Sequence, residues 1–570
     1  MLNEEIATIF ERMARVLAYK QANRFRTIAY ERAATAIRQA EDVAVLDRED
    51  RLEEIPGVGE DLAGKIHEYL KTGRIRKYEE ERKGLSDALI DLMSIPGLGP
   101  KTVALLRHEL KIDSLDDLKR AIDSGDLLEV PGFGEKKIKN IARAIELWIG
   151  GQKRIALGVA LPLAEDLLKD IRELPLVEQA DLAGSARRGR ETVGDLDVLI
   201  ASKDSAGALA AIAKLPPVKR VLALGGTKAT LVVEGPIQVD VRAVEKSSYG
   251  AALTYFTGSK AHNVRLREMA KQRGWKANEY GIFKDSRKLG GRSEEDLYRL
   301  LKLPFIAPEL REDRGEIEAA MKGALPDLIE AGDLRGDLHV HTNYSDGRET
   351  VEAMVEKASA MGYEYVALSD HSPAARIAHG LDEDRLEEKF EEVGQVRRKR
   401  KRKKPVILIG SEVDILSDGT LDYPEHILQR LDVVIGSIHA GFRQDRDRMT
   451  GRLLDALDNP YLHVLGHPTG RLLGTREAIQ FDFNKVLKKA VDCGVALEIN
   501  ASWQRLDLND TMARAAQDAG AMLAIGSDAH STAQMEYIRY GVTQARRGWI
   551  EAKHVINTWP LKKLSKWLKR

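Results

Sequence analysis

The chain has 570 residues, of which 43% are hydrophobic and 31% are charged. This length exceeds what one hydrophobic core supports, and it predicts roughly three to five globular domains. The 89 basic and 89 acidic residues give a net charge of +0, which excludes a histone-like basic coat but not local contacts with nucleic acid.

The N-terminus and the cysteine count predict the compartment. The first segment is amphipathic and acidic, without the basic start and cleavage site of a secretory signal, and no apolar run reaches the roughly 18 residues of a membrane span. The single cysteine, Cys493, excludes an intramolecular disulfide and a zinc site built from thiolates. We therefore expect a cytoplasmic protein without a membrane partner.

A Pro-Gly-x-Gly pattern recurs at 55–59, 95–99 and 130–134, and a helical stretch that carries lysine follows each copy. Two glycines permit a tight turn, and the N–H groups that open the next helix can hold a phosphate oxygen. Such contacts bind DNA without reading its sequence. One copy could be an ordinary helical hairpin, but three copies favour DNA binding. The glycines concerned are Gly57, Gly59, Gly97, Gly99, Gly132 and Gly134.

These repeats resemble the helix-hairpin-helix motif. The resemblance implies sequence-independent binding of the DNA backbone, often with a bound monovalent cation such as K⁺ or Na⁺. The first part of the chain is therefore expected to hold DNA.

Residues from about 155 to 245 read as β-branched strands with glycine turns, and they carry three aspartates. Asp195 and Asp197 are two apart on a predicted strand, so both carboxylates project from one face, and a later hairpin places Asp240 on an adjacent strand. Converging carboxylates repel unless divalent cations neutralise them, and their hard oxygens suit Mg²⁺ or Mn²⁺. Two such ions would clamp the attacking and leaving oxygens of a phosphoryl displacement.

A lone Asp-x-Asp pair is typical of a solvated strand end, but here Gly184-Ser185 lies upstream and offers a cradle for a triphosphate. The combination resembles the nucleotidyltransferase fold. The segment 255–267 and the tripeptide 278–280 closely resemble the thumb of DNA polymerase beta and its family X relatives. This resemblance covers roughly residues 1–315.

The family resemblance implies a role for each matching residue. Asp195 and Asp197 would hold both metals, and Asp240 would hold the catalytic metal and help to activate the primer 3′-OH. Gln238 stands where DNA polymerase beta has an arginine, so proton removal from the primer is expected to be tuned differently. The residues expected to bind the incoming nucleotide are Gly184, Ser185, Arg188 and Gly194 on its phosphate side, Tyr255, Phe256 and Gly258 near its sugar, Asn263 at its base edge and Arg267 on the template side.

In the same relatives the first hairpin carries a lyase that removes 5′-deoxyribose phosphate through a lysine Schiff base. Lys65 matches the Schiff-base position and Tyr30 a supporting tyrosine, but Asp61 and Arg26 replace supporting lysines. A neighbouring carboxylate favours the protonated amine, which is not nucleophilic. The resemblance therefore leaves two readings for Lys65, a weak lyase and simple binding of a 5′-phosphate.

From residue 334 onward, short apolar strands alternate with helical stretches, as in a βα barrel. Histidines and acidic residues follow these strands, at the end where βα barrels build active sites. A single such histidine would be a hydrogen-bonded core residue, but six with three acidic partners indicate a metal centre for Zn²⁺, Mn²⁺ or Fe²⁺. The candidate ligands are His339, His341, Asp346, His371, Glu412, His439, His467, Asp528 and His530.

This set resembles the polymerase-and-histidinol-phosphatase (PHP) family, whose members hold three metals in a distorted βα barrel. The resemblance groups the ligands as His339, His341, Glu412 and Asp528; as Asp346, His371 and His467; and as Glu412, His439 and His530. It implies metal-assisted attack of water on a phosphodiester. We expect a 3′→5′ exonuclease and consider an abasic-site endonuclease.

The predicted fold class is a multidomain α+β chain. Its expected parts are a lyase-like helical domain (1–80), fingers (81–150), a nucleotidyltransferase palm (151–245), a thumb (246–315), a linker (316–333) and the PHP barrel (334–570). The expected protein is a monomer that binds gapped or nicked DNA, a primer-template and deoxynucleoside triphosphates, and that fills short gaps in base excision repair or acts in end joining. Two alternatives are a barrel that hydrolyses small phosphate esters and a DNA-end scaffold with an inactive palm.

Overall fold

The computed structural model describes residues 2–40, 43–95, 97–152, 154–235, 237–401 and 403–569. The chain divides into two compact units, Met1–Lys153 and Arg154–Arg570. Each unit is described by itself.

The first unit is helical. The helices are α1 (Leu2–Tyr19), α2 (Arg24–Gln39), α3 (Val43–Arg48), α4 (Glu60–Thr72), α5 (Arg76–Glu81), α6 (Asp87–Leu92), α7 (Pro100–Leu110), α8 (Leu115–Asp123) and α9 (Glu135–Gln152). The core of this unit gathers apolar side chains such as Phe10, Ile37, Leu89 and Leu106, and the amphipathic first helix contacts α2, α3, α5, α6 and α7.

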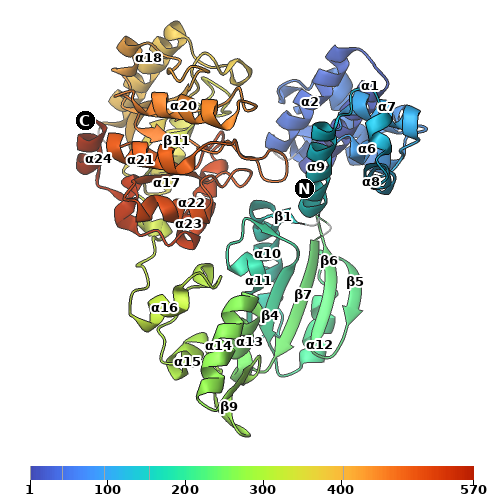
Figure 1. The fold of residues 1–570 in the computed structure, drawn as a ribbon, viewed down its shortest axis with the longest axis vertical. Coiled ribbons are helices and arrows are strands. Elements are labelled where there is room, and N and C mark those ends of the chain that lie inside the picture. The colour runs from blue at the N-terminus through green and yellow to red at the C-terminus, as the bar shows by residue number, and fades with distance from the viewer. Residues whose placement is uncertain are drawn as a thin grey trace. The chain divides into compact units, whose positions relative to one another are not determined.

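The palm opens the second unit with a five-stranded sheet in the order β2-β4-β7-β6-β5, in which only β4 and β7 are parallel neighbours. Helices α10 and α12 pack on it (Figure 1). The elements are β1 (Ile155–Ala156), α10 (Leu157–Arg172), β2 (Gln179–Leu182), α11 (Gly184–Arg187), β3 (Thr192–Val193), β4 (Leu196–Ala201), α12 (Ser205–Ile212), β5 (Val218–Leu224), β6 (Lys228–Val233) and β7 (Ile237–Val244).

The region predicted as the thumb joins three helices to a three-stranded antiparallel sheet. A buried ion pair between Arg311 and Glu294, at 2.7 Å, stabilises its end. The elements are α13 (Tyr249–Thr257), α14 (Lys260–Gln272), β8 (Lys276–Asn278), β9 (Gly281–Lys284), β10 (Arg287–Gly290) and α15 (Glu294–Leu300), followed by the short connector helix α16 (Glu316–Met321).

Seven parallel strands in chain order form the barrel of the C-terminal region. Its first and last strands meet, because Asp528 N donates to His339 O at 3.0 Å and His341 N donates to Ala529 O at 2.8 Å. The strands are β11 (Gly336–Val340), β12 (Tyr365–Leu368), β13 (Val406–Asp414), β14 (Val433–Ser437), β15 (Val464–Leu465), β16 (Ala496–Asn500) and β17 (Leu523–Gly526).

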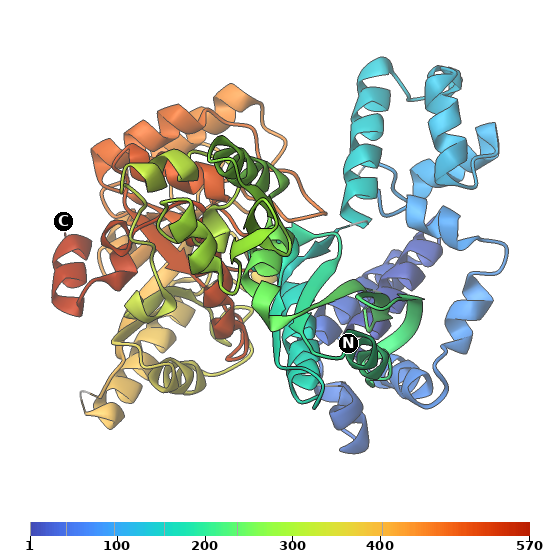
Figure 2. The same ribbon diagram turned by 90° about the horizontal axis from the view of Figure 1, so that it is seen from below.

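Helices cover the outside of the barrel, whose yellow-to-red ribbon forms one lobe with the C-terminus at its edge (Figure 2). They are α17 (Val351–Ala360), α18 (Glu383–Arg400), α19 (Glu425–Leu428), α20 (Arg446–Leu457), α21 (Phe483–Cys493), α22 (Asp510–Asp518), α23 (Ile538–Arg547) and α24 (Leu561–Leu568). All five residues of β11 are buried, as expected for a parallel strand covered on both sides. The predicted fold class is confirmed. In the described part of the chain, no helix is long and apolar enough to span a bilayer.

Candidate active sites

The three Pro-Gly-x-Gly copies form the same turn. The first glycine of each has a positive φ, +79° at Gly57, +87° at Gly97 and +82° at Gly132, which side chains other than glycine rarely adopt. The second glycine comes directly before a helix, at Gly59 before α4, at Gly99 before α7 and at Gly134 before α9.

These second glycines are not required by packing. A Cβ on Gly59, Gly99 or Gly134 would meet no protein atom within 4 Å, and none of the three has a positive φ. The fold would accept a larger residue at each position. Glycine there leaves the helix N-terminus open to a ligand outside the chain.

Two of the palm aspartates lie side by side on neighbouring strands. Asp197 on β4 and Asp240 on β7 are register partners. The prediction that Asp195 lies on the same strand as Asp197 is wrong, because Asp195 lies in the bend before β4. The carboxylate of Asp240 already has two partners, since Oδ1 accepts from the hydroxyl of Thr230 at 2.8 Å and Oδ2 pairs with Lys228 Nζ at 2.7 Å.

This cluster carries an excess of negative charge. Burial, together with the neighbouring charges of Asp195 and Asp240, raises the pKa of Asp197 to about 6. Gly184 has φ +62°, and a Cβ there would lie 2.1 Å from Asp197 Oδ2, so glycine is required for the carboxylate to occupy its place. The donor set is all oxygen and anionic, which fits Mg²⁺ or Mn²⁺.

Beside the carboxylates, Arg188 at the end of α11 reaches the thumb. Its Nη1 donates to Thr257 O at 2.5 Å, and its Nε pairs with Glu312 at 3.1 Å. A Cβ on Gly258 would lie 3.2 Å from Arg188 Nη1. Ser185 is half-buried on the same turn, and Gly194 lies in the bend before β4.

The residues expected at the sugar and base lie together on the thumb. The rings of Tyr255 and Phe256 meet edge to face at 5.2 Å, and the guanidinium of Arg242 lies 4.4 Å from the Phe256 ring. Asn263 Nδ2 donates to Tyr255 O at 2.7 Å. Tyr255, Asn263 and Arg267 line one small cavity of about 40 Å³.

In the first unit, Lys65 is paired with Asp61, which stands where the family has a supporting lysine. Its Nζ lies 2.5 Å from Asp61 Oδ1, with the Lys65 side chain 11% exposed and that of Asp61 85% exposed. The ring of Tyr30 is 6.0 Å from the amine. The amine must therefore separate from the Asp61 carboxylate and lose its proton before it can form a Schiff base.

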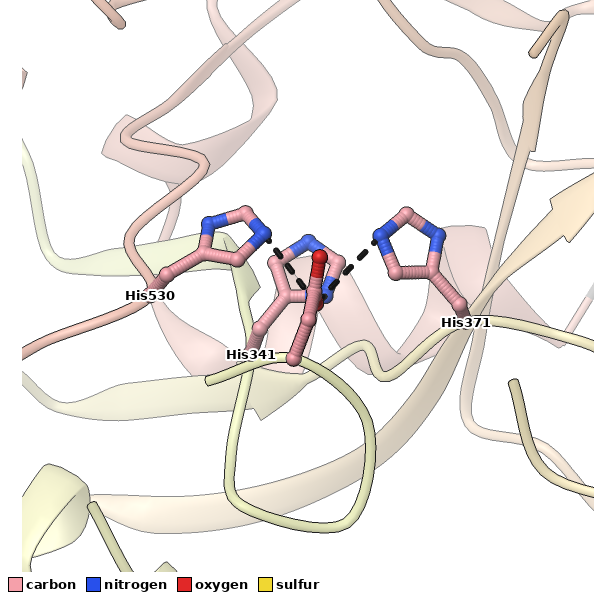
Figure 3. A group of neighbouring side chains, drawn as sticks. His341, His371 and His530 are labelled. Atoms are coloured by element: carbon pink, nitrogen blue, oxygen red, sulfur yellow. Dashed lines mark ion pairs between the residues drawn. The ribbon is translucent and has the colours of Figure 1, made fainter. Parts of the chain in front are cut away.

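All nine histidine and acidic residues predicted in the C-terminal region converge at one end of the barrel. Ligand atoms of eight of them, all but His467, form three groups, each within 4.8 Å. Figure 3 shows the side chains of His341, His371 and His530 turned toward one another. The groups are His339, His341, Glu412 and Asp528; His341, Asp346, His371 and His530; and His371, Glu412 and His439.

The first group is the predicted one, but the other two differ from the prediction. The second holds His530 and His341 in place of His467, and the third holds His371 in place of His530. His467 belongs to none of the three groups. His530 Nε2 lies 3.2 Å from Asp346, while His467 Nε2 lies 2.7 Å from Glu412. The reason is the order of the strands. His530 follows β17, which closes the barrel against β11, whereas His467 follows β15, which lies beside β14 and the adjoining His439.

The donor set fits imidazole-plus-carboxylate metal sites. Several of its atoms are buried without a hydrogen-bond partner, namely His339 Nε2, both ring nitrogens of His341, His371 Nδ1 and Asp346 Oδ1. Buried polar atoms without partners are rare and costly. Divalent ions would satisfy them.

The charges of the cluster keep its acids ionised. Burial disfavours these charges, but His439 and His339 hold the pKa of Glu412 well below its usual range. Burial likewise opposes the charged form of His439, yet Glu412 and Asp414 raise its pKa to about 10. Burial lowers the pKa of His371 to about 4, so this ring is neutral and able to act as a ligand.

Glu498 is a functional candidate that the sequence analysis missed. Its Oε1 lies 2.6 Å from His339 Nδ1, and its Oε2 accepts from the backbone N–H of His467 at 2.6 Å. A carboxylate behind a ligating histidine fixes the ring and its tautomer. Its position in the sequence could have indicated this role. Glu498 lies near the end of β16, and every other strand of the barrel carries or adjoins a candidate ligand.

The metal groups open into a pocket of about 700 Å³. Arg505 lines it, with Nε 3.4 Å from Asp528 Oδ2 and with a buried Nη1 that has no hydrogen-bond partner. Ile377, also at this pocket, is 99% exposed. The pocket therefore offers a cation beside the candidate metal ligands and an apolar side chain open to solvent.

Four family models match the chain. They are a helix-hairpin-helix domain over residues 1–75, a SAM-like helix-hairpin-helix tandem over 89–146, the DNA polymerase beta thumb over 252–312 and the PHP domain over 337–502. The chain is 35% identical over 576 residues to the DNA polymerase/3′-5′ exonuclease PolX of Bacillus subtilis (strain 168), covering all of both chains. The chain belongs to the PolX family.

Other relatives match a smaller part of this PolX-family chain. A "Probable phosphatase" of Thermoanaerobacter sp. (strain X514) is 30% identical over 238 residues, which cover 39% of the chain and 89% of the relative. Another, of Clostridium acetobutylicum, is 31% identical over 211 residues, covering 34% of the chain and 78% of the relative.

Proposed function

We propose that the chain is a DNA-directed DNA polymerase of family X whose PHP domain is a 3′→5′ exonuclease. The observation that carries the proposal is that one chain, similar over its whole length to PolX, contains groups of candidate metal ligands in the barrel and, separately, two register-paired palm aspartates with the charge of a third beside them.

In the palm, the residues that would hold two Mg²⁺ or Mn²⁺ ions are Asp195, Asp197 and Asp240. Ions bound there supply charge neutralisation and orient the reacting oxygens. Arg188 and Ser185 would bind the triphosphate. The Tyr255–Phe256 edge would border the sugar and exclude a 2′-OH.

In the barrel, the nine predicted ligands would hold three divalent ions of the Zn²⁺, Mn²⁺ or Fe²⁺ class. Ions there activate water and stabilise charge on a phosphodiester. Glu498 fixes the ring of His339, and Arg505 would bind a phosphate oxygen of the 3′-terminal nucleotide. An abasic-site endonuclease would use the same groups.

The first unit would hold the DNA. The open helix starts at Gly59, Gly99 and Gly134 would receive backbone phosphates, with K⁺ or Na⁺ beside them. Lys65 would bind the 5′-phosphate of a gap, with lyase chemistry secondary while Asp61 holds its amine. Filling of short gaps in base excision repair or end joining, by a cytoplasmic monomer, is the role that fits these parts.

A primer assay tests the proposal. The full chain, with a recessed or one-nucleotide-gapped duplex and Mg²⁺ or Mn²⁺, should lengthen the primer when deoxynucleoside triphosphates are present and shorten it when they are omitted. EDTA should stop both reactions. A protein that does neither with either ion contradicts the proposal.

The relatives named "Probable phosphatase" favour one second candidate, hydrolysis of small phosphate esters by the barrel. A panel of soluble esters, histidinol phosphate among them, compared with labelled DNA decides between the two. Faster turnover of an ester than of a DNA 3′ end would assign the barrel to small molecules.

A further inference from the structure

The loop that follows the nucleotide-binding turn α11 is held by the PHP domain. Arg547 Nη1, at the end of α23, donates to the backbone oxygen of Arg188 at 2.6 Å. A Cβ on Gly189 would lie 2.2 Å from Thr543 Cγ2, so α23 packs directly on the loop. Glu191 then accepts from Gln544 at 2.9 Å. Consecutive turns of one barrel helix thus support residues 188–191 of the palm.

The same arginine also reaches the partner of the Arg188 side chain. Glu312 Oε1 accepts from Arg188 Nε at 3.1 Å and from Arg547 Nη1 at 3.1 Å. Arg547 is 1% exposed, and its Nη2 pairs with Asp510 at 2.8 Å. One buried guanidinium therefore joins palm, thumb and barrel.

This arrangement determines how strongly Glu312 holds Arg188. Because Glu312 pairs with both Arg188 and Arg547, it binds Arg188 less tightly than it would alone. The Arg188 guanidinium can therefore contact a triphosphate. If Arg547 were removed, Glu312 would be neutralised by Arg188 together with the more distant Arg190, at 3.9 Å. The backbone of Arg188 would also lose its donor from α23. Both changes draw Arg188 away from a nucleotide.

We propose that Arg547 of the PHP domain is a positioning residue for nucleotide addition, which holds Arg188 ready for the triphosphate of the incoming nucleotide. The inference rests on the proposed polymerase function. It makes the exonuclease domain a structural part of the polymerase site, so that nucleotide affinity depends on a residue far along the chain from the palm.

A matched control lies on the same helix. Arg539 also crosses from α23 to the palm, where it pairs with Glu165 on α10 at 3.0 Å, but both side chains are exposed and neither contacts residues 188–191. Loss of this pair weakens docking of the two domains without touching the loop. A comparison of the two arginine variants therefore distinguishes positioning of Arg188 from general stabilisation of the palm–barrel interface.

The test is steady-state gap filling by full-length Arg547→Met and Arg539→Met proteins, with the KM for the nucleotide and kcat measured separately. Arg547→Met should raise the KM at least about tenfold, with kcat and primer degradation within about twofold of the parent, and Arg539→Met should leave all three unchanged. A parental KM in Arg547→Met, or an equal KM rise in Arg539→Met, overturns the inference.

Because removal of a buried arginine can unfold a protein, Arg547→Lys is the second variant. Lysine keeps the charge but cannot reach Arg188 O, Glu312 and Asp510 together, so the KM should rise by an intermediate factor. A KM equal to that of the parent would again overturn the inference. Failure of the parent itself to extend a primer would instead contradict the proposed function.

Discussion

The palm and the barrel build candidate metal sites in opposite ways. In the palm, two register-paired aspartates and a third from a bend lie near Lys228 and Arg242, which oppose their mutual repulsion. In the barrel, eight of the nine predicted ligands form the metal groups, His467 contacts Glu412, and buried ring nitrogens are left without hydrogen bonds. The first site needs only the pairing of β4 with β7, whereas the second exists only once the barrel has closed.

The largest effect should come from the position where the palm has no spare room. Gly184→Ala places a methyl group 2.1 Å from Asp197 Oδ2 at a φ of +62°, so it displaces a candidate metal ligand. Primer extension should fall by about 10²-fold or more, as expected when several kcal/mol of transition-state stabilisation are lost. Degradation should be unchanged. Gly226→Ala, where a Cβ meets nothing within 4 Å, is the control.

In the barrel, activity should depend on a residue that supports a candidate ligand without being one. Glu498→Gln retains shape but weakens the contact with His339, so metal affinity and degradation should fall by about 10- to 100-fold. Titration with Mn²⁺ measures the metal affinity, and release of a labelled 3′-terminal nucleotide measures degradation. Unchanged metal affinity would show that Glu498 is only a packing residue.

Ion binding in the barrel should depend on pH through its histidines, which the palm site lacks. In the barrel, burial opposes the charged form of His530, but Asp346 and Asp528 raise its pKa to about 9, and that of His439 is about 10. Below these values a binding ion must displace protons. Affinity should therefore rise with pH between 7 and 9, by up to about tenfold per unit for each proton released. Calorimetry in buffers of different ionisation enthalpy would count the protons, and a value of zero contradicts the account.

The smallest effect is expected in the helical unit. The Cβ of Gly59→Leu would meet no protein atom within 4 Å, so folding should be unaffected while the Kd for gapped DNA rises by about fivefold, roughly 1 kcal/mol. Gly332→Leu, at an equally open position outside the repeats, should bind DNA as the parent does. Equal binding by both variants would show that the first turn does not contact DNA.

The comparison of the two sites also shows what the sequence could predict. The ligand types were predictable because strand ends and motif spacing are local properties, and the fold class followed from them. The grouping of His467 and His530 was not, since it depends on β17 meeting β11 across the closed barrel. Glu498 was missed because its role is to hold His339 and not to face the pocket. Arg547 was missed because its palm and thumb partners, Arg188 and Glu312, lie more than two hundred residues away in the sequence.

The most direct measurement is a paired comparison of Asp197→Ala and His339→Ala on one gapped primer-template, with Mg²⁺ or Mn²⁺ and with nucleotides supplied or withheld. Two independent centres predict that Asp197→Ala loses extension and retains shortening, while His339→Ala loses shortening and retains extension. If either substitution abolished both reactions in a folded protein, or if neither reaction changed, the division of labour between palm and barrel would be wrong.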